Sequence, residues 1–175
     1  MNPVAKGTPI KLAQEASAKA ARAKRQTGNP LKAALEAQGF TVEEAGELGL
    51  RFQYEGGTYY LPPSGADTEF FHLLFPNFWE LESDEEFGRA LVACDAVNRE
   101  AKLVKLHTAE GDVWAGVEAL HDSPEAFITH LPRYLSYVQE AVRVFRDAML
   151  AQGEEQVEEQ ADDSQEAQEH AETAR

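Results

Sequence analysis

The sequence is poor in cysteine, in long apolar runs and in basic residues beyond its first 32 positions, and each shortage excludes something. Its single cysteine, Cys94, rules out an intramolecular disulfide, and its place on an apolar helical stripe predicts a buried thiol. No apolar run approaches the roughly 20 residues of a membrane span. The first residues contain no apolar signal-peptide core, so we expect a cytoplasmic protein.

Signatures of catalysis and of metal binding are also missing. Zinc sites normally combine closely spaced cysteine and histidine pairs. Here the histidines of the central segment are scattered singly, at His72, His107, His121 and His130. A reactive thiolate needs an electropositive and accessible setting, but Asp95 directly follows Cys94. We therefore expect a protein that is not an enzyme, with no catalytic residue, no metal and no cofactor.

Charge is divided sharply along the chain. Residues 1–32 carry a net charge of +6, residues 33–150 a net −13 and residues 151–175 a net −8. Affinity for DNA depends largely on Lys and Arg side chains that displace counterions, so the acidic central segment argues against direct DNA binding. The same acidity favours fast association with a basic partner.

Composition divides the chain into three parts. Residues 1–28 are Ala-rich and basic, and we expect a flexible or partly helical extension because its apolar face offers little to pack. Residues 29–151 form the folded domain. Residues 152–175 have almost no large apolar side chain, which predicts an acidic, disordered tail. The extension offers candidate nucleic-acid contacts at Lys19, Arg22, Lys24 and Arg25.

The stretch from Ser83 to Glu100 predicts the helix around which the domain is organised. Ser83 and Glu86 fit a capping box, in which each side chain satisfies a free backbone N–H group. Its predicted apolar stripe consists of Phe87, Ala90, Leu91, Cys94 and Val97. Ala93 and Ala96 lie beside this stripe, where a second element could approach closely. Asn98, near the helix end, is expected to make a structural hydrogen bond to the following turn.

Alternating polarity and turn residues predict strands on both sides of this helix. We expect them over residues 40–45, 50–54, 58–61, 68–75, 102–108 and 113–120. Pro76 would end the fourth strand. Further helices are expected over residues 29–38 and 123–153, the latter with a kink or a junction at Pro132. The order α-βββ(β)-α-ββ-α predicts an α+β fold, with an antiparallel sheet of five to six strands covered mainly on one face.

Three segments carry a resemblance to a known family. They are Leu31–Phe40 with its Gly-aromatic exit, the meander from Leu50 to Tyr60, and Ala93–Asn98 before a Lys-rich strand. Together they resemble the YbjN-like proteins, whose fold is shared with the type III secretion chaperones, over about residues 30–150. The resemblance implies a small antiparallel sheet packed with helices. It also implies dimerisation and the binding of other proteins through exposed apolar patches, and it transfers no catalytic residue.

Five aromatic residues between positions 70 and 79 are more than one small sheet face needs, although most must belong to the core. Aromatic side chains are enriched at binding hot spots. The candidates for binding a partner or a second copy are Phe71, Phe75, Phe78, Trp79, Leu91 and Trp114. We hypothesise a homodimeric, chaperone-like or regulatory adaptor that binds a basic protein, itself a candidate nucleic-acid binder. The alternative is a nucleic-acid accessory protein that binds through its basic extension.

Overall fold

Six antiparallel strands form one sheet in the order β1-β2-β3-β4-β6-β5. The computed structural model describes residues 28–173, with side chains as far as Gly153, so the predicted basic extension lies outside the described residues. The strands are β1 (Val42–Glu44), β2 (Leu50–Tyr54), β3 (Gly57–Leu61), β4 (Phe70–Glu80), β5 (Val104–Ala109) and β6 (Asp112–Leu120). Around them lie α2 (Pro30–Ala37), α3 (Asp84–Glu100), α4 (Pro124–Thr173) and the 3-10 turn η1 (Gly46–Leu48). The predicted α+β fold is confirmed.

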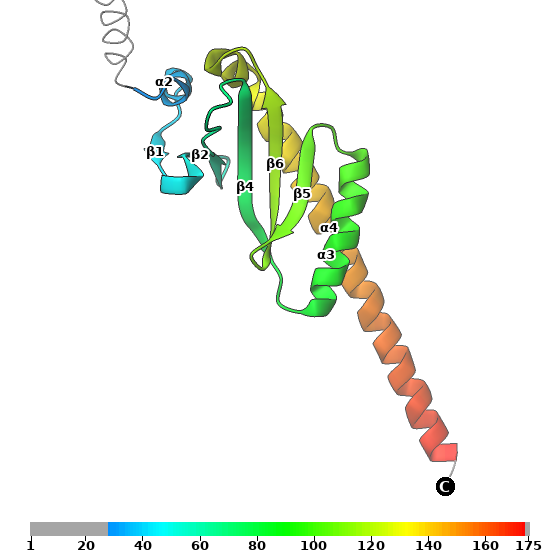
Figure 1. Ribbon diagram of the computed structural model, residues 1–175. Coiled ribbons are helices and arrows are strands. Elements are labelled where there is room, and N and C mark those ends of the chain that lie inside the picture. The colour runs from blue at the N-terminus through cyan, green and yellow to red at the C-terminus, as the bar shows by residue number, and fades with distance from the viewer. Residues whose placement is uncertain (1–27, 174–175) are drawn as a thin grey trace, which may run out of the picture.

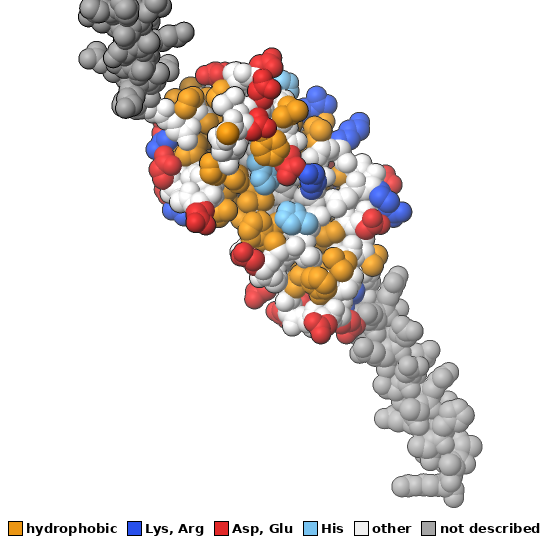
Figure 2. Space-filling model, viewed as in Figure 1, with side chains coloured by type: hydrophobic (Ala, Val, Ile, Leu, Met, Phe, Trp, Pro, Cys, Tyr) orange, Lys and Arg blue, Asp and Glu red, His pale blue; other side chains and the backbone are white. Residues whose placement is uncertain are grey.

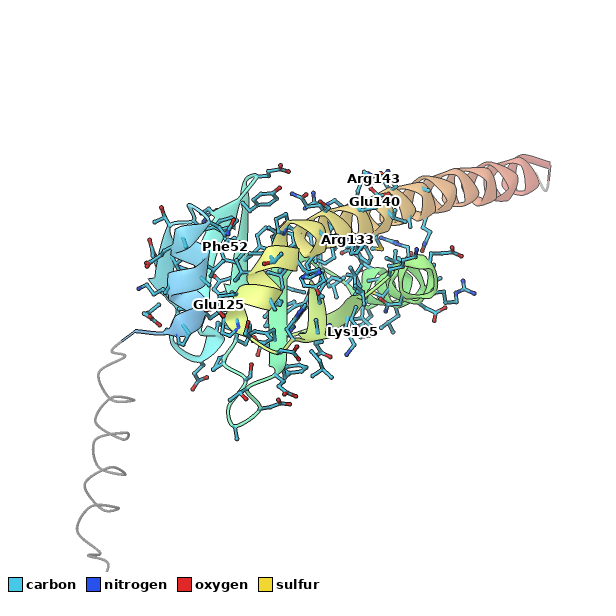
Figure 3. The ribbon with its side chains drawn as sticks, turned by 90° about the horizontal axis from the view of Figure 1, so that it is seen from above. Phe52, Lys105, Glu125, Arg133, Glu140 and Arg143 are labelled. Atoms are coloured by element: carbon cyan, nitrogen blue, oxygen red, sulfur yellow. The ribbon has the colours of Figure 1, made fainter. Side chains whose placement is uncertain are left out.

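The long helix α4 crosses one face of the sheet and holds the layers together (Figure 1). It contacts β4, β5 and β6 as well as both other helices, α2 and α3. Its buried residues recur at helical spacing and are Phe127, Leu131, Tyr134, Leu135, Val138, Ala141, Val142, Phe145 and Met149. Viewed from above, α2 and α4 lie on the same side of the strands, and the opposite side carries loops (Figure 3).

The start of α4 follows the sequence prediction, and its end does not. Ser123 Oγ accepts a hydrogen bond from the Ala126 backbone N–H at 3.2 Å, with Pro124 as the first helical residue. The helix then runs through Pro132 without a junction and continues to Thr173, past Gly153. The predicted disordered tail is therefore helical in its backbone, because its Glu, Gln and Ala residues are strong helix formers even without apolar packing. None of the described helices is long and apolar enough to cross a membrane.

Strand β4 also runs further than expected. It continues past Pro76 to Glu80, and its pairing with β6 shifts register between Phe75 and Trp79. Asn77 adopts a positive φ of 52° at this irregularity. Proline is tolerated at a bulge, where the missing N–H breaks no ladder bond. The shift places Phe78 and Trp79 against α4 instead of ending the strand.

Each edge of the sheet is protected in a different way. The edge strand β1 has three residues, and Glu43 and Glu44 form ion pairs with Arg51 and Lys32. At the opposite edge, α3 lies beside β5 and its Asn98 side chain bonds the backbone of Leu106. Short, charged or covered edges prevent a sheet from pairing with further strands.

Candidate functional site

Three of the aromatic residues predicted to bind a partner build the core. Phe71 is 6% exposed and stacks on Phe127 with ring centroids 4.9 Å apart. Phe78 meets Phe145 edge to face at 5.3 Å. Phe75 is half-buried and stacks on a buried tyrosine of β3 at 4.8 Å. Helix α4 covers Phe71 and Phe78, which are therefore not available to a partner, and Phe75 is partly covered by its neighbour strand β3.

Trp79, the fourth predicted residue, links β4 to the start of α3. Its Nε1 donates a hydrogen bond to Glu86 Oε1 at 2.8 Å, and its ring contacts Phe145 edge to face at 5.8 Å. Glu86 Oε2 accepts a second bond from the Glu82 backbone N–H at 2.9 Å. These two hydrogen bonds lower the pKa of Glu86 below its ordinary value. The bond from the Glu82 N–H has the larger effect, and the bond from Trp79 has the second largest. Trp79 and Glu86 thus fix the beginning of α3 by a variant of the predicted capping box.

Helix α3 presents its large apolar side chains to solvent and its small ones to the core. The buried residues are Ala90, Ala93, Cys94 and Val97. By contrast, Phe87 is 42% exposed, Leu91 48% and Val92 63%. Between them lies Gly88, where an added Cβ would meet no atom within 4 Å. We call Phe87, Gly88, Leu91 and Val92 the outer face of α3. A helix that is apolar on two sides normally has a neighbour on each.

Trp114 lies on the helix-free face of the sheet, since its neighbours in β6 on the other face, Val113 and Ala115, belong to the core. It is half-buried, and its Nε1–H is buried without a hydrogen-bond partner. His72 lies over Gly116 on the same face. A Cβ atom placed on Gly116 would be only 2.9 Å from His72 Nε2, so this position has no room for a side chain. Burial is the main cause that lowers the pKa of His72 below its ordinary value and disfavours its charged form. Figure 2 shows a band of hydrophobic side chains across this face, with histidines inside it.

A groove between α3 and α4 was not predicted as a site. It has a volume of about 540 Å³, and its apolar lining comprises Ala96, Val97, Ala101, Tyr137, Ala141, Val144 and Ala148. Glu100, Lys102 and Glu140 complete the lining. A second hollow of about 480 Å³ shares Lys102 and Tyr137 with it and continues toward Arg133. The signal available in the sequence was Ala96, whose small side chain allows the close approach that we expected there.

The described residues show no constellation for catalysis or for metal binding. Among them, no group of three or more His, Cys, Asp or Glu side chains is placed to hold a metal ion. Cys94 is buried, as predicted, and burial raises the pKa of its thiol to about 11. His121 instead shares a hydrogen bond of 2.7 Å with the Tyr134 hydroxyl, beside Phe127. These groups serve packing, and the absence of enzymatic activity stays a prediction.

Comparisons with known proteins return a similarity in fold. No protein-family model matches the chain. No curated protein matches it either. A crystal structure of YbjN from E. coli, described as a candidate transcription regulator, is similar at 15% sequence identity and a TM-score of 0.48. The match covers 70% of this chain and 90% of YbjN. Nothing about family, activity or partners follows from this match.

Of the predicted binding residues outside the cluster at positions 70–79, Leu91 is exposed and Trp114 is half-buried. They belong to two different faces, the outer face of α3 and the helix-free face of the sheet. The predicted nucleic-acid contacts Lys19, Arg22, Lys24 and Arg25 lie outside the described residues.

Proposed function

We propose that the protein is a non-enzymatic, homodimeric protein-binding module that escorts or regulates a basic protein. The observation that supports it is the arrangement of α3, with alanine and cysteine facing the core and Phe87, Leu91 and Val92 facing solvent. Solvent-exposed apolar patches on a soluble domain mark interaction surfaces. Gly88 is consistent with such a contact, because glycine within a helix costs about 1 kcal/mol relative to alanine but permits close helix approach.

A second copy of the chain fits this face. Leu91 and Val92 lie at the middle of the 17-residue helix, so a two-fold axis there pairs two α3 helices antiparallel. That arrangement brings the acidic first turn at Asp84 toward Arg99 of the second copy. Opposite charges then meet at both ends of the contact, and apolar side chains meet at its centre.

The partner of this dimer is basic. Residues 28–153 contain 21 acidic and nine basic side chains. A surface with this excess attracts positively charged proteins and repels nucleic acid. The charge of +6 in residues 1–32 favours a second candidate function, nucleic-acid association through Lys19, Arg22, Lys24 and Arg25.

Light scattering at micromolar concentration tests the dimer. We expect the wild-type chain at twice its 19.4 kDa mass and Leu91→Arg at the mass of one chain. Leu150→Arg is the matched control, because Leu150 is 60% exposed on α4 and lies outside the outer face of α3. A wild-type monomer contradicts the dimer, and loss of the dimer in both variants contradicts its placement on α3.

A measurement of DNA binding separates the two functions. Binding of single-stranded DNA that is lost when the four basic residues of the extension are changed to Glu supports the alternative. Unchanged, weak DNA binding supports the protein-binding function.

A further inference from the structure

The groove between α3 and α4 continues into the hollow beside Arg133, so one channel follows α4 from His130 to Ala148. At 1.5 Å per residue this stretch of α4 is about 27 Å long, which corresponds to several helical turns. Figure 3 shows Arg133, Glu140 and Arg143 along this part of α4. The channel lies away from the outer face of α3, since it is bounded by Ala96, Val97 and Glu100 of that helix.

The lining of the channel selects the secondary structure of its occupant. One wall is α4, and the other is the C-terminal end of α3 together with residues 101–103, which follow it. Backbone groups inside a helix are already paired, so an extended peptide would find backbone partners only near residues 101–103 and would leave most of its own polar groups unpaired against apolar side chains. A helix satisfies these groups itself. The alanines at 96, 101, 141 and 148 also allow two helix axes to approach closely.

Charge along the channel selects the direction of that helix. His130 and Arg133 line the hollow at one end, Glu100 and Glu140 line the groove, and Lys102 lies where the two meet. Arg143 bonds Glu140 at 2.7 Å and neutralises part of its charge, whereas the Glu100 side chain is exposed. A helix carries partial positive charge at its N-terminus and negative charge at its C-terminus. The favourable orientation places the C-terminus near Arg133 and basic side chains near Glu100.

Leu103 supplies an apolar contact at the mouth of the channel. It adopts a left-handed backbone conformation with φ 66° and is 56% exposed. This conformation costs a branched residue about 1 kcal/mol or more, and it is uncommon outside glycine and asparagine. An exposed leucine in such a conformation gains nothing from its own domain, but it would pack against a helix lying in the channel.

We propose that this channel binds an amphipathic helix of the basic partner protein. The helix has Ala and Leu on one face and Lys or Arg beside it, with its C-terminal end at His130 and Arg133. The proposal rests on the proposed protein-binding function and names its binding site.

Peptide titration tests the site. The probe is a synthetic 16-residue helical peptide with Ala and Leu on one face, flanking Lys residues and a fluorescent label. We expect Val144→Arg to weaken its binding to the full chain at least tenfold, since Val144 lines the groove and is 39% exposed. Leu150→Arg, on the same helix outside the groove, should leave the affinity unchanged. Equal binding to both variants, or no binding by wild type at millimolar peptide, overturns the proposal.

Three further measurements distinguish binding in the channel from binding at the outer face of α3 or to the basic extension. Peptides with Glu in place of Lys, or with a central Pro, should bind at least tenfold more weakly. Leu91→Arg should bind the peptide normally, so that failure of the dimer and failure of the channel remain distinguishable. Changing Lys19, Arg22, Lys24 and Arg25 to Glu in the full chain should not alter the affinity. A tenfold rise would show that the chain's own extension occupies the channel and would overturn the assignment to a partner.

Discussion

The side-chain amide of Asn98 bonds both backbone groups of Leu106. Its Nδ2 donates to the Leu106 carbonyl at 2.9 Å, and its Oδ1 accepts from the Leu106 N–H at 2.8 Å. The amide of α3 thus occupies the position that a neighbouring strand would have beside β5. The sequence predicts that Asn98 makes a structural hydrogen bond to the turn after its helix. In the structure the partner is instead Leu106, which lies beyond that turn in β5.

Asn98→Ala should therefore destabilise the protein and open the β5 edge. Loss of two bonds to one residue leaves a donor and an acceptor unpaired, which costs about 1–3 kcal/mol. Urea unfolding measures this loss, and light scattering after prolonged incubation should show larger aggregates. Arg99→Ala is the control, because the Arg99 side chain is 73% exposed and its ion pair with Asp95 contributes little. If the two variants are equally stable, Asn98 does not stabilise the β5 edge.

Glu86→Gln should weaken the start of α3 by about 1 kcal/mol at pH 7, because Gln offers one neutral acceptor oxygen to the two N–H groups that the Glu86 carboxylate binds. The pKa of Glu86 is lowered in the folded state, so its stabilising effect is present above the ordinary Glu pKa. The effect is lost as the pH falls through the lowered value. The difference between wild type and variant in urea unfolding should therefore shrink on acidification, and a constant difference would contradict the assignment.

Trp79→Ala should lower the free energy of unfolding by about 3 kcal/mol, at the lower end of the range for aromatic truncation because Trp79 is half-buried. The contact with Phe145 and the bond to Glu86 are both lost. Trp79→Phe keeps a ring and loses the bond, and it should cost about 1 kcal/mol. The sequence predicts that Trp79 serves a partner, so a stable Trp79→Ala variant would restore that role.

Cys94 should react slowly with thiol reagents in the native protein. Burial raises the pKa of its thiol to about 11, so the thiolate fraction at pH 8 is on the order of 100-fold below that of an exposed cysteine. Alkylation followed by mass spectrometry should be slow in buffer and fast in urea. Rapid modification of the folded protein would show that Cys94 is accessible.

Two glycines should respond to alanine in opposite ways. At Gly116 an added Cβ would lie 2.9 Å from the Leu73 backbone oxygen, so Gly116→Ala should cost about 1–3 kcal/mol. At Gly88 it meets open space, so Gly88→Ala should stabilise one chain by about 1 kcal/mol and weaken the dimer. Thermal unfolding and light scattering separate these effects.

Local patterns predicted most elements correctly, because the decisive interactions lie close in sequence. Asn29 caps α2, Ser83 caps α3, and alternation at Leu50–Tyr54 gives β2. Periodicity was right for part of α3. Of the predicted stripe, Ala90, Cys94 and Val97 face the core, whereas Phe87 and Leu91 are exposed. Ala93, which was placed beside the stripe, is buried. The choice of buried residues is made by α4 and β5, which are distant in sequence.

The sequence predicted the candidate site less well than it predicted the fold. An aromatic cluster has the same appearance whether it is core or interface, and only the course of α4 over β4 decides for Phe71 and Phe78. The groove depends on the close approach of α3 and α4, which follows from tertiary packing. Pro76 showed a similar limit, since it ends many strands but is accommodated here by a register shift.

The protected edges of the sheet have a consequence for the kind of protein this domain recognises. With Asn98 occupying one edge, and a short charged strand at the other, an unfolded polypeptide finds no row of backbone groups to pair with. The surfaces left to it are formed by side chains of helices and of one sheet face. Such a domain should discriminate by the shape of structured partners and ignore nascent or denatured chains.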